Sequence, residues 1–128
     1  MSEPMLGRDV PVSEYGTLDS FPVDRPVEVQ FETCELQALC PAVSGIQPDI
    51  YRCTIAYRAV SASIESKSLK LFLVTFRDRR IFAEHLAAEI GAAIDAVDGV
   101  ALDRVTLEQN VRGGLTETVT YRGSAATA

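Results

Sequence analysis

The polar side chains that could do chemistry are most concentrated in the stretch Glu65-Ser66-Lys67-Ser68-Leu69-Lys70 of this 128-residue chain. Apolar residues recur at helical spacing from Leu69 to Phe76, so the stretch is predicted to open a helix and to carry charges in its first turns. Two lysines beside a helix start oppose the helix dipole, which makes them poor choices for stability alone. A charged run is usually a solvated face, so this one defines a site only together with other residues.

The cysteines are the candidate nucleophiles. Cys34, Cys40 and Cys53 cannot all pair with one another, and none has a Cys-x-x-Cys spacing. Their odd number favours a reducing compartment and leaves room for a reactive thiol. Cys53 falls on the apolar face of a predicted strand and is expected in the core. His85 is the single histidine, so the chain has few ligands for a Cys/His zinc site, and we expect no metal.

Composition predicts one folded domain without membrane or nucleic-acid contacts. Hydrophobic residues make up 47% of the chain, yet no apolar run approaches the roughly 18 residues of a membrane span. The start Met1-Ser2-Glu3-Pro4 lacks the basic flank and apolar centre of a signal peptide, so we expect a cytoplasmic protein. A net charge of -6 argues against a tight grip on a nucleic-acid backbone.

The order of elements predicts an α+β fold. Residues 1–25 are expected to form an irregular arm, 26–122 a single domain, and 123–128 a frayed tail. Within the domain we expect strands at 27–33 and 50–58, helices from Ile64 or Glu65 to Phe76 and from 82 to about 97, and strands at 101–110 and 115–121. A four-stranded antiparallel sheet with both helices on one face, in the order ββααββ, is the simplest way to bury these apolar faces. The candidate caps of the first helix are Ser61 and Ser63.

The stretch from Glu65 to Phe72 resembles the signature of the 7-cyano-7-deazaguanine reductases, the nitrile reductases of queuosine biosynthesis, in which it helps to bind NADPH. That family also has the segments Cys-Pro-x-x-Gly-Gln-Pro-Asp, Ile-Phe-His-Glu and Arg-Gly-Gly. The same order occurs here in Cys40-Pro41 with Gln47-Pro48-Asp49, in Ile81-Phe82-Ala83-Glu84 and in Arg112-Gly113-Gly114. The resemblance covers about residues 28 to 115. It implies the tunnelling fold, whose units join edge to edge into stacked rings with sites between subunits.

The resemblance implies a role for each matching residue. Cys40 would add to the nitrile carbon and form a covalent thioimide, and Asp49 would be the general acid/base. To act as an acid near neutrality, Asp49 should lie in a desolvated pocket or near another carboxylate. The contacts to substrate would come from Glu84, which suits a guanine-like edge, and from Glu65 and Ser66. The contacts to NADPH phosphates would come from Lys67, Lys70 and Arg112, since no GxGxxG motif follows a strand.

Two departures from the family pattern bear on the substrate. Eight residues lie between Cys40 and Asp49, two more than in the family's segment, so we expect a bulged loop. Ala83 stands where the family has histidine. His85 is two positions further along and about 200° around a helix, so it cannot replace that side chain.

The resemblance implies an NADPH-dependent reduction of 7-cyano-7-deazaguanine to the aminomethyl compound by a homo-oligomer whose partner is a small deazapurine. An amidine-forming relative would keep the thioimide but resolve it with ammonia or an amine. A binding protein of the tunnelling fold would hold a purine or pterin and never consume NADPH. The longer loop and Ala83 favour the binding protein, whereas the lysine-rich stretch argues against the amidine-forming relative.

Overall fold

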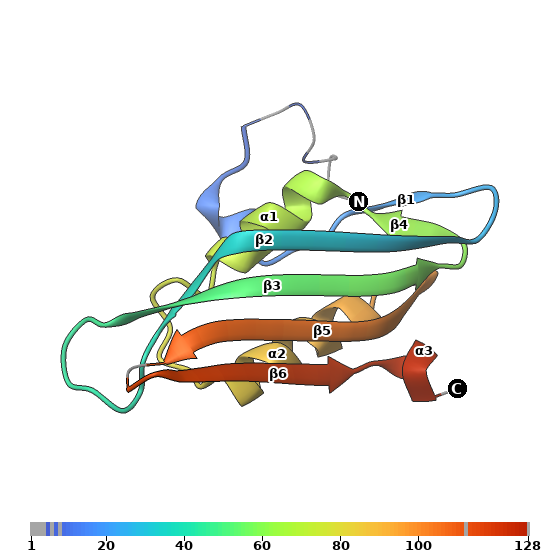
Figure 1. Cartoon of the computed structure of the whole chain (residues 1–128). Coiled ribbons are helices and arrows are strands. Elements are labelled where there is room, and N and C mark those ends of the chain that lie inside the picture. Colours follow the sequence, from blue (N-terminus) through green and yellow to red (C-terminus); the bar gives the residue numbers. More distant parts are fainter. Residues whose placement is uncertain (1–4, 6, 8, 112, 128) are drawn as a thin grey trace.

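The chain folds into a four-stranded antiparallel sheet covered on one face by two helices, with a separate sheet of two short strands beside it (Figure 1). The structure is a computed structural model, and it describes all residues except 1–4, 6, 8, 112 and 128. Its elements in chain order are η1 (Val12–Glu14), β1 (Ser20–Pro22), β2 (Val27–Leu39), β3 (Pro48–Ala59), β4 (Ala62–Ile64), α1 (Ser66–Val74), α2 (Ala83–Asp95), β5 (Val100–Val111), β6 (Leu115–Arg122) and α3 (Ser124–Thr127).

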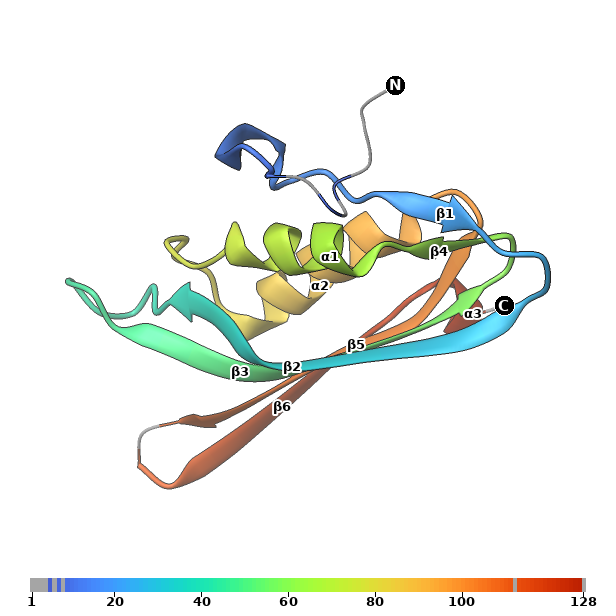
Figure 2. The same cartoon turned by 90° about the horizontal axis from the view of Figure 1, so that it is seen from above.

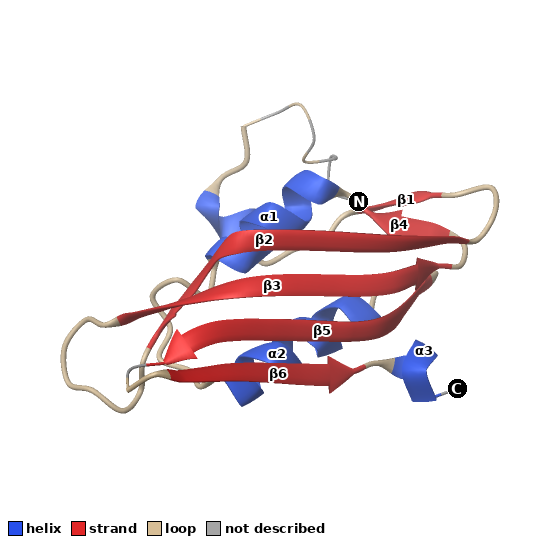
Figure 3. Cartoon of the chain, viewed as in Figure 1, coloured by secondary structure: helices blue, strands red, loops and turns tan. Residues whose placement is uncertain are grey.

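The long strands are arranged in the order β2-β3-β5-β6, and all three neighbouring pairs are antiparallel. Figure 2 shows both α1 and α2 on the same face of this twisted sheet. The predicted α+β class and the order ββααββ are confirmed. Strands β2 and β6 form the two edges of the four-stranded sheet (Figure 3).

The core lies between the sheet and the helices. Alternation along β3 buries Tyr51, Cys53, Ile55 and Tyr57 on the helix-covered face. Cys53 is 1% exposed, which confirms it as a core residue, and this burial raises the pKa of its thiol to about 12. The helices contribute large apolar side chains to the same cluster, among them Leu69, Phe72, Leu86, Ile90 and Ile94.

Strand β2 is longer than the sequence indicated. Its register with β3 shifts between Thr33 and Leu36, where a bulge interrupts the regular pairing. Inward side chains fall on odd positions before the bulge, such as Phe31, and on even positions after it, such as Leu36. The predicted end of the strand at Thr33 is wrong, because one bulge reverses the alternation without ending the strand.

Helix α1 begins with a different cap from the one expected. The carboxylate of Glu65 accepts hydrogen bonds from the backbone N–H groups of Lys67, at 2.7 Å, and Ser68, at 2.9 Å. Ser63 is instead engaged with the hydroxyl of Tyr57 at 2.8 Å. The expectation of Ser61 or Ser63 as the cap is therefore wrong. Glutamate is uncommon as a helix cap, which is why the sequence did not indicate Glu65.

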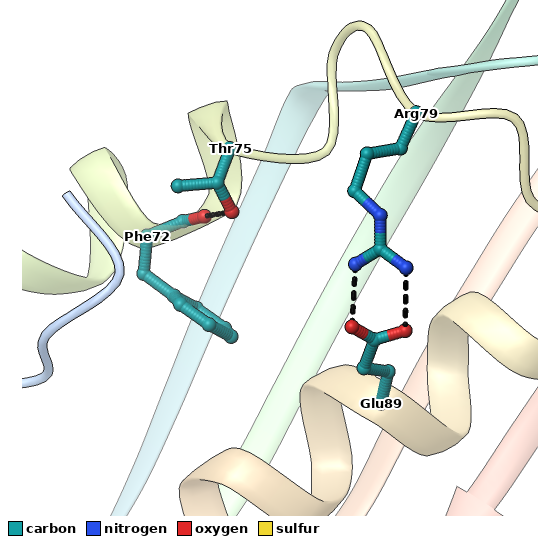
Figure 4. A network of polar contacts seen from close by, with 4 residues as sticks. All are labelled: Phe72, Thr75, Arg79 and Glu89. Carbon is teal, nitrogen blue, oxygen red and sulfur yellow. Dashed lines mark hydrogen bonds and ion pairs between the residues drawn. The ribbon is translucent and has the colours of Figure 1, made fainter. Parts of the chain in front are cut away.

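The connection between the two helices is braced by side chains. The hydroxyl of Thr75 donates to the carbonyl oxygen of Phe72 at 2.6 Å, just beyond the end of α1. Arg79 forms a two-pronged ion pair with Glu89 of α2, which Figure 4 shows bridging the turn and the helix. The same guanidinium lies 5.3 Å from the centre of the Phe76 ring. Arg79 therefore holds the turn before α2 in place through Glu89 on one side and Phe76 on the other.

The terminal segments are more ordered than expected. In the arm, β1 pairs antiparallel with β4, and Asp19 accepts from the N–H of Met5 at 2.8 Å. In the tail, Asp95 at the end of α2 accepts from both the N–H and the hydroxyl of Ser124. The arm is thus not irregular throughout, and the described part of the tail is a docked helical turn. Among the described residues, no helix has the length and apolar character needed to cross a bilayer.

Candidate active site

Cys40 and Asp49 lie close to each other at the loop end of the β2–β3 hairpin. Cys40 directly follows β2, and its N–H donates to the carbonyl oxygen of Gln47 at 3.0 Å. Asp49 is paired with Ala38, so Cys40 and Asp49 are diagonal neighbours across the two strands. Diagonal neighbours in an antiparallel pair are about 7 Å apart. The two additional residues are accommodated in the loop 41–46, and the spacing of Cys40 and Asp49 across the hairpin does not depend on them.

The environment of Asp49 favours its protonated form. Burial raises the pKa of Asp49 above its ordinary value, and the negative charge of Glu117 raises it further. Glu117 lies on β6 and accepts a hydrogen bond from the side chain of Gln109 at 2.9 Å. A desolvated carboxyl group near a second carboxylate is the arrangement expected of an acid that works near neutrality.

Glu117 was not identified from the sequence. Alternation along β6 places it on the same face as Val119 and Tyr121, which pack against the core. A carboxylate among inward-facing apolar positions was the signal available. It carries no motif, and only the pairing of β5 with β6 brings it to this end of the sheet.

Tyr51 lies where the predicted residues converge. Its hydroxyl is buried and has no hydrogen-bond partner within the described part of the chain. Burial raises the pKa of Tyr51 above the ordinary tyrosine value, and the charges that raise it further belong to Asp49, Glu117, Cys40 and Glu84. Four acidic groups from four segments therefore act on one neutral hydroxyl. The sequence indicated only a core tyrosine, because a residue in an alternating strand shows nothing of its neighbours.

The start of α2 places Glu84 near the Tyr51 hydroxyl. Leu39 at the end of β2 forms a parallel bridge with Arg80, so the segment before α2 runs beside the hairpin. Glu84 is exposed in the first turn of α2, whereas Ala83 is buried. His85 is exposed, as expected for a residue that cannot take the place of the side chain at position 83.

The residues of α1 form a second group. Ser66 and Lys70 line a groove of about 390 Å³ between α1 and β2, together with Arg77. Lys67 is half-buried and is not part of this lining. Glu65 is 8% exposed, and its carboxylate is engaged with the helix start. Arg112 lies outside the described residues, although Gly113 and Gly114 beside it have the positive φ expected of their turn.

The groove approaches the first group along β2, where its lining includes Leu36, the cross-strand partner of Tyr51. The residues of β3 that line the groove are Cys53 and Ile55, four and six positions beyond Asp49. At about 3.3 Å per residue, they lie roughly 13 to 20 Å along the strand from Asp49. Within the described ranges, no three His, Cys, Asp or Glu side chains are grouped so that they could hold a metal ion.

Comparison with known proteins defines the class. The sheet and helices form the tunnelling fold, and the solved structure of the archaeosine synthase QueF-Like in the apo form shares it. That structure has a TM-score of 0.65 and 17% sequence identity, with 80% of this chain and 96% of that chain covered. At this identity the likeness shows the fold alone.

Sequence comparison then shows the family. A family model described as QueF-like protein matches residues 48–127. Two relatives, both named NADPH-dependent 7-cyano-7-deazaguanine reductase, come from Frankia casuarinae and Syntrophus aciditrophicus. The first is 39% identical over 85% of this chain and 88% of its own length, and the second is 36% identical over 90% and 81%. The chain belongs to the QueF-like family.

Proposed function

We propose that this protein is an NADPH-dependent nitrile reductase that converts 7-cyano-7-deazaguanine to its aminomethyl product, as the names of its relatives indicate. The observation that carries the proposal is the convergence of Cys40, Asp49 and Glu84 on Tyr51 at one end of the sheet. A thiol, an acid of raised pKa and a carboxylate are the groups that such a reaction needs. The three free cysteines suit a cytoplasmic location, where thiols stay reduced.

In the proposed reaction, Asp49 takes the proton of the Cys40 thiol, and the sulfur adds to the nitrile carbon. A C–S bond forms, one C–N π bond breaks, and the nitrogen receives the proton from Asp49 to give a thioimide. NADPH, when bound, supplies one hydride to this carbon and a second molecule supplies another. With each hydride the nitrogen would gain one proton from solvent. Between the two transfers the C–S bond would break while an N–H proton returns to the sulfur, which regenerates the Cys40 thiol and leaves an imine.

The remaining residues have binding roles in this proposal. The exposed carboxylate of Glu84 accepts two parallel N–H donors from the guanine-like edge. Lys70 and Arg77 line the groove with an ammonium and a guanidinium group, and the hydroxyl of Ser66 beside them remains the proposed substrate contact. The two cationic groups fit the phosphates of NADPH, with Lys67 and Arg112 as further contacts.

The proposed active unit is a homo-oligomer in rings, with sites between subunits. Within the described residues, β2 and β6 each have one neighbouring strand in the sheet, so each leaves an edge unpaired except for the bridge of Leu39 to Arg80 at the end of β2. The groove beside β2 lies on one of these edges. A second chain paired at this edge would bring its own residues toward the groove, which supports a site shared by two chains.

The proposal is tested by intact-protein mass spectrometry after incubation with 7-cyano-7-deazaguanine, followed by addition of NADPH. We expect an adduct on Cys40 that disappears as the amine forms, and no adduct in Cys40→Ala. An adduct that resists NADPH but is resolved by ammonia would indicate amidine formation instead. Absence of any adduct on a free Cys40 thiol would refute nitrile chemistry and leave a purine-binding protein.

A further inference from the structure

The loop that follows Cys40 has little support of its own. Residues 42–46 are exposed, and the Ile46 side chain is 85% exposed. The backbone hydrogen bond from Cys40 to Gln47 closes the base of the loop. An exposed segment of this kind, two residues longer than in the family's pattern, would ordinarily be mobile. The candidate nucleophile lies at its first residue.

The side chain of Arg80 spans this loop. Its Nη2 donates to the carbonyl oxygen of Gly45 at 2.8 Å. Its Nη1 donates to the carbonyl oxygens of Val43 at 3.0 Å and of Cys40 at 3.3 Å. A guanidinium group is suited to this task because its donors are fixed in one planar fork. Hydrogen bonds from a charged donor are also stronger than neutral ones.

Arg80 is itself held by rigid neighbours. The N–H of Leu39 donates to the carbonyl oxygen of Arg79 at 2.8 Å, and the N–H of Ile81 donates to that of Leu39 at 3.2 Å. The ion pair of Arg79 with Glu89 ties the same segment to α2 (Figure 4). The guanidinium of Arg80 therefore connects the loop to the framework of β2 and α2.

We propose that Arg80 is a positioning residue that clamps the loop 41–46 and so holds the sulfur of Cys40 in place beside Asp49. The role of the clamp in catalysis rests on the proposed nitrile chemistry of Cys40. Arg80 does not contact the reacting atoms in this assignment. It acts through the backbone of Cys40, Val43 and Gly45, whose carbonyl oxygens it binds together.

The test compares Arg80→Ala with Arg52→Ala, an exposed arginine of β3 whose partner is Glu32. Hydrogen exchange measures the mobility of residues 40–47, and mass spectrometry measures the rate of adduct formation with 7-cyano-7-deazaguanine. In Arg80→Ala we expect faster exchange in this segment and an adduct rate that falls roughly ten- to a hundredfold, because misplacing a reacting group by about 1 Å can cost a hundredfold. Arg52→Ala should change neither.

Rescue separates positioning from general loss of stability. Arg80→Lys and the addition of millimolar guanidinium ion to Arg80→Ala should each restore part of the adduct rate, since each returns a cationic donor to the carbonyl oxygens. Unchanged exchange in Arg80→Ala, or faster exchange with an unchanged adduct rate, would overturn the proposal. If the unmodified protein forms no adduct, the nitrile function fails, and exchange alone still decides whether Arg80 clamps the loop.

Discussion

At the scale of single residues, the site combines groups of opposite hydrogen-bonding capacity. Asp49, Glu84 and Glu117 accept hydrogen bonds when ionised, whereas Tyr51 keeps its proton because its pKa is raised. A buried hydroxyl without a partner lowers the stability of the fold. The Tyr51 hydroxyl lies among the candidate catalytic groups, so we infer that it serves the reaction and not the stability of the fold.

Replacing Tyr51 with phenylalanine should therefore stabilise the protein and impair turnover. Removing an unsatisfied buried hydroxyl should raise the free energy of unfolding by about 1 kcal/mol. Turnover should fall about tenfold, since loss of one donor of ordinary strength has an effect on the order of 1.4 kcal/mol on the barrier. Urea unfolding and NADPH consumption measure the two effects.

The matched control is Tyr57→Phe, because the Tyr57 hydroxyl is bonded to Ser63 and to the N–H of Ile64. That change should lower stability and leave the site intact. A destabilised Tyr51→Phe variant with normal turnover would show that the hydroxyl has a structural partner instead.

The pH dependence of the reaction should respond to Glu117. Its charge raises the pKa of Asp49, so Glu117→Gln should lower that pKa. Because Asp49 must be ionised to take the proton of the Cys40 thiol, its active form would then persist to lower pH, and the acidic limb of the kcat profile should move to lower pH. Glu108→Gln, an exposed change on the neighbouring strand β5, should leave the limb in place. A shift of this limb toward alkaline pH would contradict the assignment of Asp49 as the group that takes and returns the proton.

At the scale of elements, α1 depends on Glu65. The lysines near its start oppose the helix dipole, and the buried carboxylate of Glu65 compensates for them while it satisfies two backbone donors. The resemblance assigned Glu65 to substrate contact. Its position as a cap supports a structural role whether or not substrate also reaches it.

Glu65→Ala should lower the free energy of unfolding by about 1 kcal/mol, the usual cost of losing a helix cap. Chemical denaturation measures the loss, and Glu28→Ala on the exposed part of β2 is the control. If stability is unchanged while the affinity for the deazapurine falls, Glu65 serves the ligand and not the helix.

At the scale of the whole molecule, the unpaired edges of β2 and β6 predict association. Because association stabilises only the folded chain, the melting temperature should rise with protein concentration. Calorimetry over a hundredfold range of concentration, with native mass spectrometry, would measure both the shift and the subunit number. A monomeric mass with a constant melting temperature would contradict the proposed oligomer.

Local pattern was enough to determine much of this protein. Apolar periodicity and turn residues predicted the order of strands and helices, because side-chain burial in this sheet follows the alternation of the chain. The motifs around Cys40, Asp49 and Glu84 predicted residues that the structure does bring to one end of the sheet. These features depend on residues close in sequence, and they could be predicted without coordinates.

Only the tertiary structure decided what surrounds those residues. The bulge in β2 continued a strand beyond its apparent end at Thr33, since a register shift depends on the partner strand. Glu117 lies near Asp49 because β3, β5 and β6 pair side by side. Arg80 reached the loop after Cys40 across about forty residues of chain. Such contacts are set by packing between distant segments, and no local pattern of charge or hydropathy encodes them.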